Sequence, residues 1–410
     1  MLLSLVPTVA LASTPTGSKE KTWAGIADGD VLVKDTITQI ANGVVEHEVV
    51  ANTTAGNDQK IDYMCRVQLS DSIKIVACYG QDNADRWGMY KTTQQAAYYE
   101  ENHPGETVVA GINADFFNMG TGEPMGALVM DGKICHGANN RWYFAILKDG
   151  TPVIRNSPDL SDCQQAVGGW VPLVKDGQLC TEYYEYGADD YSRCTIGIME
   201  DGSVVTSVTH GRLTPVSCGR TYKEIAEMYQ RAGCVDALIL DGGGSATYAA
   251  RIEGSDKLEV RNSPSDGAER EVSSTLLIVS TAEKTGEFDH VAITPNNELY
   301  TPGYEVQFEA SGVDTAGFPM DIPEGVTWAL ADDSVDMGTI DADTGKFVAG
   351  EKTGTVTVQM MKDGEVMGST TIEIAIPDHI YFNSEEVSLG FEAESDLTLV
   401  VRNKDRDMHI

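Results

Sequence analysis

Short runs of apolar and β-branched residues recur along the first two thirds of the chain, each followed by a cluster of polar and glycine residues. Such runs predict strands, here at residues 66–69, 73–77, 108–112, 127–130, 142–147, 195–199, 204–208, 237–240 and 275–279. Asp-Gly pairs at 131–132, 149–150, 176–177 and 201–202 separate many of them. Because Asp-Gly favours the tight turns of hairpins, we predict a region rich in short, hairpin-linked strands.

A few helices interrupt these strands. Residues 92–101 form one, and residues 221–233 form the clearer one. Thr221 can cap the second helix, and Glu224 completes a capping box. Its apolar side chains Ile225, Met228 and Tyr229 fall on one face, and Gly233 suits its end. Strands with a few helices predict an α+β fold for this region.

The pattern changes after residue 286 to alternating strands at 288–293, 305–310, 326–330 and 355–360. This stretch resembles a bacterial immunoglobulin-like module, and the resemblance implies an all-β sandwich. A similar opening starts again at residue 378, but no closing strands precede residue 410. We expect the start of a further, incomplete β domain there, and hence a fragment of a longer protein.

Charge supports a boundary near residue 285. The 410 residues carry a net charge of −34. The stretch from Gly286 onward holds 25 acidic and six basic residues, net −19, against −15 for the longer stretch before it. So acidic a chain is not expected to bind nucleic acid or an anionic membrane surface, because like charges repel. The predicted organisation is a truncated signal segment at 1–12, a lead at 13–60, a catalytic domain at 61–285, the immunoglobulin-like domain at 286–377, and the further segment at 378–410.

The first twelve residues are apolar and end in a small-x-small site, as in a secretory signal that lacks its basic start. No later apolar run reaches the ~20 residues needed to span a bilayer. We therefore expect a secreted or cell-surface location.

Eight cysteines, an even number, all precede residue 285: Cys65, Cys78, Cys135, Cys163, Cys180, Cys194, Cys218 and Cys234. Outside the cytoplasm such cysteines can pair. Cys65 and Cys78 flank a predicted strand–turn–strand and are the expected pair, with buried free thiols as the alternative. No C-x-x-C spacing occurs, so a structural zinc site is not expected.

Two predicted strands run directly into groups capable of chemistry. The strand at 237–240 is followed by Asp241, Gly242, Gly243, Gly244 and Ser245. Consecutive glycines allow close approach of a ligand and expose backbone N–H groups to an anion. The strand at 108–112 likewise runs into Asn113 and Asp115. A tight turn after a core strand is the alternative interpretation for the glycine-rich segment.

These segments, with others between and after them, stand in the order of the motifs of the phosphodiester glycosidase family, which the chain resembles over residues 60–281. The matching segments are Ile112-Asn113-Ala114-Asp115-Phe116-Phe117, Gly122-Glu123-Pro124-Met125-Gly126, Arg193-Cys194-Thr195-Ile196-Gly197, Gly211-Arg212 with Ser217-Cys218-Gly219-Arg220-Thr221, Leu240-Asp241-Gly242-Gly243-Gly244-Ser245, and Arg270-Glu271-Val272-Ser273-Ser274-Thr275-Leu276. Ala114, Cys194 and Ser274 depart from the residues usual in the family. None of these departures removes a carboxylate or an arginine.

The resemblance implies a hydrolase that cleaves the bond between a sugar, such as α-N-acetylglucosamine, and the phosphate of a 1-phosphodiester. Its oxocarbenium-like transition state needs a carboxylate as nucleophile, as base or for stabilisation. Asp241 and Asp115 are the catalytic candidates, with structural turn roles as the alternative. A separation of about 5 Å implies retention and a wider one implies inversion.

The leaving phosphate needs hydrogen-bond donors and positive charge. Arg193 and Arg270 match the family motifs and Arg212 is a third candidate, each with a structural ion pair as the alternative. Gly242, Gly243, Gly244 and Ser245 add backbone and hydroxyl donors. Asn113 either binds the sugar or pins its loop. His210 either assists protonation or is structural.

No obligatory cofactor is expected. A divalent cation near Asp115, Asn118 and Glu123 is an alternative, because these side chains offer hard oxygen ligands, but their spacing has no known loop pattern. The expected partner is a phosphate-linked glycan, and the oligomeric state is left open. The competing functions are a non-catalytic carbohydrate- or cell-wall-binding surface protein and a phosphodiesterase that cuts the P–O bond.

Overall fold

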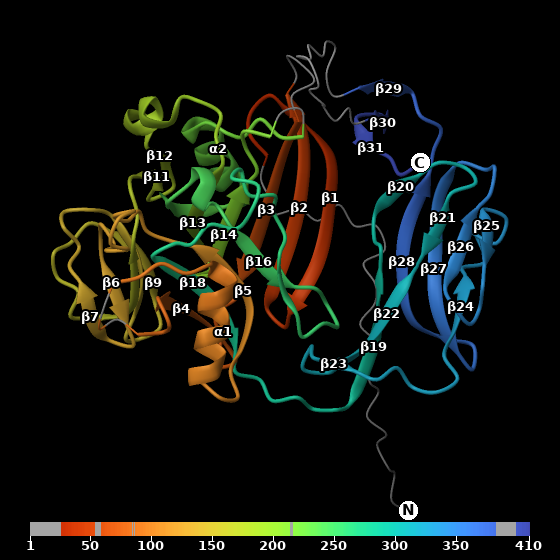
Figure 1. The fold of residues 1–410 in the computed structure, drawn as a ribbon, viewed down its shortest axis with the longest axis horizontal. Helices are drawn as coiled ribbons and strands as arrows, with labels where there is room; N and C mark the ends of the chain where they lie inside the picture. The colour runs from red at the N-terminus through yellow and green to blue at the C-terminus, as the bar shows by residue number, and fades with distance from the viewer. Residues whose placement is uncertain (1–25, 54–58, 84, 86, 214–215, 383–398) are drawn as a thin grey trace, which may run out of the picture.

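The computed structural model describes residues 26–53, 59–83, 85, 87–213, 216–382 and 399–410 (Figure 1). These residues are mostly in antiparallel strands, with two α-helices, α1 (Thr92–Asn102) and α2 (Tyr222–Ala232), and two short 3₁₀ helices, η1 (Thr181–Gly187) and η2 (Gly243–Ser245). The strand-rich character and both predicted helices are confirmed. The predicted signal segment at 1–12 lies outside the described residues.

The largest sheet has eight antiparallel strands. In spatial order they are β1 (Asp30–Ala41), β2 (Val44–Thr53), β3 (Gln59–Val67), β14 (Val204–Thr209), β13 (Arg193–Met199), β15 (Cys234–Ile239), β11 (Pro172–Lys175) and β12 (Gln178–Leu179). The sequence analysis assigned residues 30–53 to an N-terminal lead. In the structure these residues form the long β1–β2 hairpin, and β2 pairs with β3. A boundary at residue 60 would therefore cut through paired strands of one sheet.

A second, five-stranded sheet faces the first. Its strands, in spatial order, are β17 (Leu258–Val260), β16 (Tyr248–Arg251), β5 (Thr107–Asn113), β18 (Ser274–Ser280) and β4 (Ile73–Tyr79). The central strands bury both faces, which explains their nearly continuous apolar runs. In β18, Leu276 and Ile278 enter the core between the sheets, whereas Leu277 and Val279 pack under α1.

Helix α2 covers the outer face of the eight-stranded sheet. Its capping box forms as predicted, since Thr221 Oγ1 accepts from the Glu224 N–H while the Glu224 carboxylate accepts from the Thr221 N–H, and Gly233 ends the helix in a left-handed conformation. Gly197 of β13 gives the helix its close approach. A Cβ there would lie 2.5 Å from the ring of Tyr229.

A smaller five-stranded sheet is inserted between β5 and β11. Its strands, in spatial order, are β7 (Lys133–His136), β6 (Leu128–Met130), β10 (Cys163–Gly168), β8 (Tyr143–Leu147) and β9 (Pro152–Arg155). Leu128, Phe144 and Val167 from this sheet join the core between the two larger sheets. The insertion is therefore fixed to the main body by shared apolar packing.

Residues 288–374 form a separate group of strands around their own core, which includes Phe308, Trp328 and Phe347. The strands are β19 (Phe288–Thr294), β22 (Glu309–Asp314) and β23 (Pro319–Met320); β20 (Glu298–Tyr300), β28 (Glu365–Ile374), β27 (Gly354–Lys362) and β24 (Thr327–Leu330); and β21 (Glu305–Gln307), β26 (Lys346–Ala349) and β25 (Gly338–Ile340). The immunoglobulin-like identity of this module stays a prediction. β29 (His379–Phe382), β30 (Leu399–Asn403) and β31 (Arg406–Asp407) form a last small sheet.

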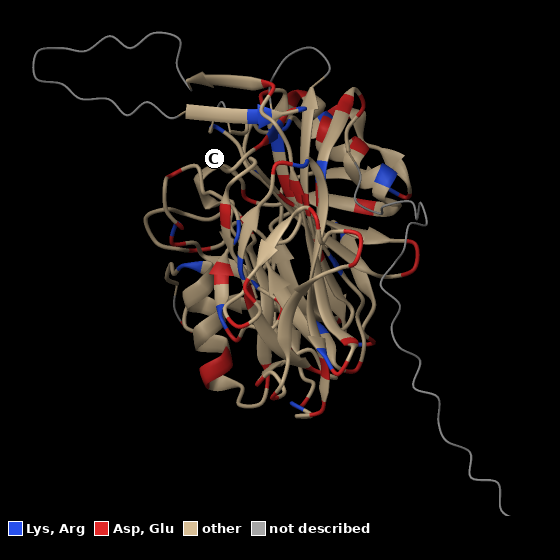
Figure 2. Cartoon of the chain, turned by 90° about the vertical axis from the view of Figure 1, so that its right-hand side faces the viewer, with Lys and Arg blue, Asp and Glu red and all other residues tan. Residues whose placement is uncertain are grey.

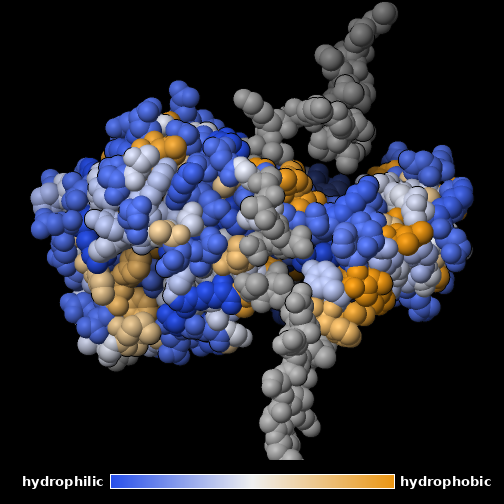
Figure 3. Space-filling model, turned by 90° about the horizontal axis from the view of Figure 1, so that it is seen from above, coloured by the Kyte–Doolittle hydropathy of each residue, from blue (hydrophilic) through white to orange (hydrophobic). Residues whose placement is uncertain are grey.

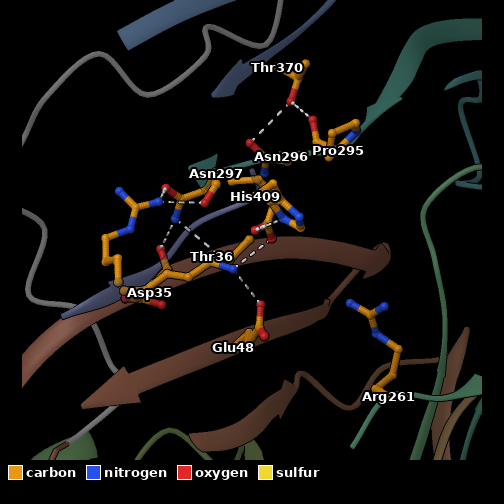
Figure 4. Close-up of polar contacts among 12 residues, drawn as sticks. Asp35, Thr36, Glu48, Arg261, Pro295, Asn296, Asn297, Thr370 and His409 are labelled. Carbon is orange, nitrogen blue, oxygen red and sulfur yellow. Dashed lines mark hydrogen bonds and ion pairs between the residues drawn. The ribbon is translucent and has the colours of Figure 1, made fainter. Parts of the chain in front are cut away.

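Polar contacts join this module to the β1–β2 hairpin (Figure 4). Lys34 binds Glu298 at 2.9 Å and Glu48 at 3.3 Å, and the Asn297 amide donates to Thr36 Oγ1 at 3.1 Å. Acidic residues lie across the face in Figure 2 with basic residues between them. Exposed apolar groups lie in separate patches on the face in Figure 3. Among the described residues, no helix is long and apolar enough to cross a membrane.

None of the eight cysteines, all within the described residues, forms a disulfide. The predicted pairing of Cys65 with Cys78 is wrong for this structure, because β3 and β4 belong to different sheets. Cys65 faces the core between the two large sheets, whereas Cys78 packs under α1.

Candidate functional site

The two strand-end carboxylates predicted from sequence meet where the two large sheets come together. β5 belongs to one sheet and β15 to the other, so strand pairing does not join them. Instead, the Asp241 N–H donates to the Ala114 carbonyl at 2.9 Å. The Asn113 amide donates to the Asp241 carbonyl at 2.6 Å and accepts from the Thr247 N–H at 3.0 Å. These bonds hold the two motifs side by side.

The Asn113 side chain therefore holds the end of β5 against the 241–247 segment. Its side chain is 1% exposed, and both its amide nitrogen and its amide oxygen bind backbone groups of the 241–247 segment. This geometry matches the loop-pinning alternative of the sequence analysis. The sugar-binding alternative has no support from these contacts.

Asp115 lies in a closed environment. It is 2% exposed, its Oδ2 accepts from the Gly126 N–H at 2.6 Å, and its buried Oδ1 has no hydrogen-bond partner among the described residues. Burial raises the pKa of Asp115 to about 7, although the Gly126 N–H and the charge of Arg141 act in the opposite direction. Near neutral pH the carboxyl is thus divided between its protonated and ionised forms.

Segments of the inserted sheet cover Asp115, and we call them the roof of the site. Gly126 precedes β6, Arg141 precedes β8, and Gly168 ends β10, so three of its segments reach the same carboxyl group. A Cβ on Gly168 would lie 2.5 Å from Asp115 Oδ2. The next segment turns back toward β15, since the Trp170 N–H donates to the Ile239 carbonyl at 2.9 Å. Glycine at 168 is what lets the backbone close over the carboxyl.

Asp241 lies in a more open setting, with its residue only partly buried. Burial raises the pKa of Asp241 to about 6, while the Ser245 hydroxyl, the Arg270 guanidinium and the Gly242 N–H lower it. The charge of Asp241 in turn raises the pKa of Asp115. The two carboxyls therefore lie close enough for the charge of one to act on the other.

Arg270 is fixed beside Asp241 by its own partners. It forms an ion pair with Asp266 at 2.6 Å and donates to Ser245 Oγ at 3.3 Å. Gly244 lies directly against this pair, because a Cβ there would come within 2.2 Å of the Arg270 guanidinium. The third glycine of the motif is thus required for packing.

Backbone bonds occupy part of the predicted anion cradle. The Gly243 N–H donates to the Ser192 carbonyl at 2.9 Å, and the Ser245 N–H donates to the Gly242 carbonyl at 3.3 Å. A Cβ on Gly242 would lie 2.6 Å from the Ser192 carbonyl oxygen. The glycines of this loop therefore serve chain packing as well as access to the site.

Arg193 and Arg212 both stack on Tyr191, with guanidinium carbons 5.3 and 3.5 Å from the ring centroid. Arg193 also donates to the Arg220 carbonyl at 2.9 Å and to the Asp189 carbonyl at 2.7 Å. Arg212 is exposed and adopts a left-handed backbone with φ of 60°. Arg193 is thus tied to the backbone, whereas Arg212 presents its charge to solvent.

His210 has a structural setting. It is 5% exposed, packs against Tyr63, and its Nε2 accepts from the Ser263 N–H at 3.2 Å. Burial lowers the pKa of His210 to about 4, so the ring is neutral near pH 7. This setting matches the structural alternative.

Sequence reasoning did not identify Arg141, Gly168 and Trp170. The Gly168-Gly169-Trp170 segment that closes β10 was the available signal, because adjacent glycines followed by a large aromatic residue indicate close backbone approach at a surface. Arg141 had no comparable signal. Among the described residues, no group of three or more His, Cys, Asp or Glu side chains is arranged to hold a metal ion.

Comparison with known proteins agrees with the motif pattern. Residues 106–279 match the phosphodiester glycosidase family. The chain is similar to N-acetylglucosamine-1-phosphodiester alpha-N-acetylglucosaminidases of Mus musculus (28% identity over 159 residues, 33% of this chain and 30% of the relative) and Bos taurus (29% over 178 residues, 38% and 33%). It is also 37% identical over 116 residues to the SPbeta prophage-derived uncharacterized protein YomE of Bacillus subtilis, covering 28% of this chain and 17% of that protein.

The matched regions thus span about a third or less of these curated relatives. Among solved structures, the auto-inhibited catalytic domain of the zebrafish N-acetylglucosamine-1-phosphodiester alpha-N-acetylglucosaminidase aligns with a TM-score of 0.47 at 19% identity, covering 60% of this chain and 88% of that one. A hypothetical protein from Synechocystis aligns with the same TM-score at 15% identity, covering 60% and 64%.

Proposed function

We propose that the phosphodiester glycosidase domain of residues 106–279 is a working hydrolase that releases α-N-acetylglucosamine, or a related sugar, from a 1-phosphodiester. The observation that carries this proposal is the pair of Asp115 and Asp241, held together by bonds between the two motifs. The carboxyls differ in exposure and in pKa, which is the condition for separate acid and base roles.

In the proposed reaction, the bond between the sugar C1 and the bridging phosphate oxygen breaks. Asp241, the more acidic carboxyl, is ionised and stabilises the developing sugar cation, either by direct attack or by activating water. Asp115, protonated on part of the molecules at neutral pH, gives its proton to the leaving phosphate oxygen. Water completes the reaction by adding hydroxyl to C1, and the other product is the phosphate monoester.

Positive charge also lies near the carboxyl pair and is proposed to help bind the substrate. Arg270 with Ser245, backed by Gly244, lies beside Asp241. Arg193 and Arg212 both lie over the ring of Tyr191. That ring is next to the glycine-rich loop, because a Cβ on Gly243 would lie 3.3 Å from it. These residues remain the proposed substrate-binding set, together with Gly242 and Gly243.

We place the reaction on a secreted or surface glycan. The apolar segment at 1–12 and the resemblance of residues 286–377 to an immunoglobulin-like module support this proposal. The natural substrate would then be a phosphate-linked glycan of a cell envelope or of a host.

The test is release of free N-acetylglucosamine from UDP-N-acetylglucosamine or from a simpler α-N-acetylglucosamine 1-phosphodiester, in water labelled with heavy oxygen. Label in the sugar supports the glycosidase. Label in the phosphate identifies a phosphodiesterase and overturns the proposal. Retained glycan affinity with neither product identifies the non-catalytic binding protein.

A further inference from the structure

Arg141 differs from the other arginines of the site in what it contacts. It lies beside Asp115, and its positive charge lowers the pKa of that carboxyl. Among the described residues no carboxylate forms an ion pair with it within 4.0 Å. Within the described part of the chain, its donors reach only the Gly169 carbonyl and the Met125 sulfur, each at 3.5 Å. These distances are at the upper limit for a hydrogen bond, so most of its donor capacity is unused.

Aromatic stacking holds this guanidinium in place without neutralising it. Its central carbon lies 4.6 Å from the Trp170 ring centroid and 5.9 Å from that of Phe116. A cation over a ring face keeps its charge and leaves its edge N–H groups available for a planar, two-point contact with an oxyanion. Trp170 is 39% and Met125 41% exposed, so the platform opens to solvent.

The other basic candidates are more strongly committed. Asp266 pairs with Arg270, and two backbone carbonyls bind Arg193. Arg212 is likewise stacked on an aromatic ring and exposed, but it is not among the charges that shift the pKa of either carboxyl. Arg141 therefore combines unused donors with an electrostatic interaction with Asp115.

We propose that Arg141, held over the Trp170 ring beside Asp115, binds the phosphate group of the substrate and stabilises its charge as it leaves. This inference rests on the proposed glycosidase function and adds a residue that neither the family motifs nor the sequence pattern singled out. It places the phosphate against the roof of the site, on the side of the carboxyl that gives up its proton. The Gly126–Asp115 bond and the glycine at 168 fix the same roof.

The experiment compares two substrates that share a sugar and differ in charge. One is an α-N-acetylglucosamine 1-phosphodiester, and the other is the uncharged 4-nitrophenyl α-N-acetylglucosaminide. For Arg141→Gln we expect kcat/KM for the phosphodiester to fall about 100-fold, while that for the uncharged glycoside changes less than about threefold, each measured at its own pH optimum. Arg141→Lys should recover part of the loss, because lysine keeps the positive charge but cannot make the planar two-point contact of the guanidinium.

Arg155→Gln is the matched control, since Arg155 also lies over an aromatic ring of the inserted sheet, 5.6 Å from the Tyr143 centroid, but is not among the charges that shift the pKa of either carboxyl. Arg212→Gln is measured beside it. Equal losses on both substrates for Arg141→Gln would make Arg141 a structural residue and overturn the inference, as would no loss on either. A larger phosphodiester-specific loss for Arg212→Gln would assign the phosphate to Arg212 instead. If the parent protein releases sugar from the uncharged glycoside but not from any phosphodiester, the proposed function itself fails.

Direct binding gives a second readout. Titration of the intact protein with inorganic phosphate and with phenyl phosphate should show weaker binding by about tenfold in Arg141→Gln. Unchanged affinity for both probes in that variant would contradict the inference even if its activity were low.

Discussion

The two catalytic candidates end strands in the same way but lie in different surroundings. Asp115 is closed over by Gly126 and Gly168, and one of its oxygens has no partner among the described residues. Asp241 remains partly open beside Ser245 and Arg270. The difference shows that a strand-end carboxylate acquires its chemistry from what covers it. Here the cover over Asp115 is a separate inserted sheet.

This comparison assigns roles that the motifs leave open. Burial raises the pKa of both carboxyls, to about 7 for Asp115 and about 6 for Asp241. The closed surroundings suit Asp115 as the proton donor, and the Ser245 and Arg270 partners suit Asp241 as the ionised group. If the two surroundings produce two roles, changes at Asp115 and at Asp241 should have different consequences.

The largest effect is expected from removing either carboxyl. Asp115→Asn and Asp241→Asn should each lower kcat/KM on the phosphodiester by about 10³-fold, because general acid and base steps typically contribute 10²- to 10⁴-fold. The measurement is sugar release by folded variants.

Asp236→Asn is the matched control for that comparison. Asp236 lies on β15, the strand that leads to Asp241, but its carboxylate pairs with Lys175 at 2.9 Å. It should retain activity within about threefold. Full activity in Asp115→Asn would reduce Asp115 to a structural residue and end the two-role interpretation.

The two carboxyls should also differ in their effect on the free energy of unfolding. Because burial raises the pKa of Asp115 from 3.8 to about 7, its contribution to stability is fully present below pH 3.8 and is lost as pH rises through 7. Asp115→Asn should therefore raise the free energy of unfolding at pH 8 by roughly 4 kcal/mol, at about 1.4 kcal/mol per pKa unit. The gain should vanish near pH 4.

Denaturant unfolding at the two pH values measures this difference. Asp241→Asn is the comparison, and its gain should be smaller because that side chain is more exposed and has hydrogen-bonding partners. A larger gain from Asp241→Asn would reverse the assignment of the closed and open pockets.

A substitution in the backbone that closes over Asp115 should have a smaller effect on activity, and this effect should arise at Asp115 alone. Gly168→Ala places a methyl group 2.5 Å from Asp115 Oδ2, so we expect about 2 kcal/mol of destabilisation and about tenfold lower activity. Gly137→Ala, on the same insertion, meets no atom closer than 3.7 Å and serves as the control. Thermal unfolding and sugar release of both variants decide whether the roof shapes the site.

Near its optimum the parent enzyme should show only a gradual dependence of activity on pH. With Asp241 ionised and Asp115 protonated, kcat/KM should peak between pH 6 and 7 and fall about tenfold per pH unit on either side. A plateau extending above pH 8 would show that Asp115 acts in its ionised form, contrary to the assignment.

Local patterns predicted the parts of the fold that depend on neighbouring residues. The capping box at Thr221 and Glu224 and the helix end at Gly233 formed as expected, because each needs only residues within one or two turns. The strands leading to Asp115 and Asp241 were found because both faces are buried, giving apolar runs that end abruptly in polar groups.

Contacts between distant segments were not predictable in this way. The β1–β2 hairpin joined the large sheet by pairing with β3, which the mixed composition of residues 13–60 did not indicate. The proposed pairing of Cys65 with Cys78 assumed that adjacent strands pair, but the chain crosses between sheets after β3. Arg141 and Gly168 reach Asp115 from an inserted sheet, and only the adjacent glycines before Trp170 offered a local signal of that approach.

The sequence by itself determined the strand-rich fold, the capped helix and the two carboxylates at strand ends, because short-range periodicity and turn chemistry encode them. The tertiary structure alone decided that these carboxyls meet between two sheets, that one is closed by an inserted sheet and the other is not, and which arginine keeps its donors free. The reason is physical. Burial and charge at a site are sums over neighbours brought from anywhere in the chain, and no local pattern records those neighbours.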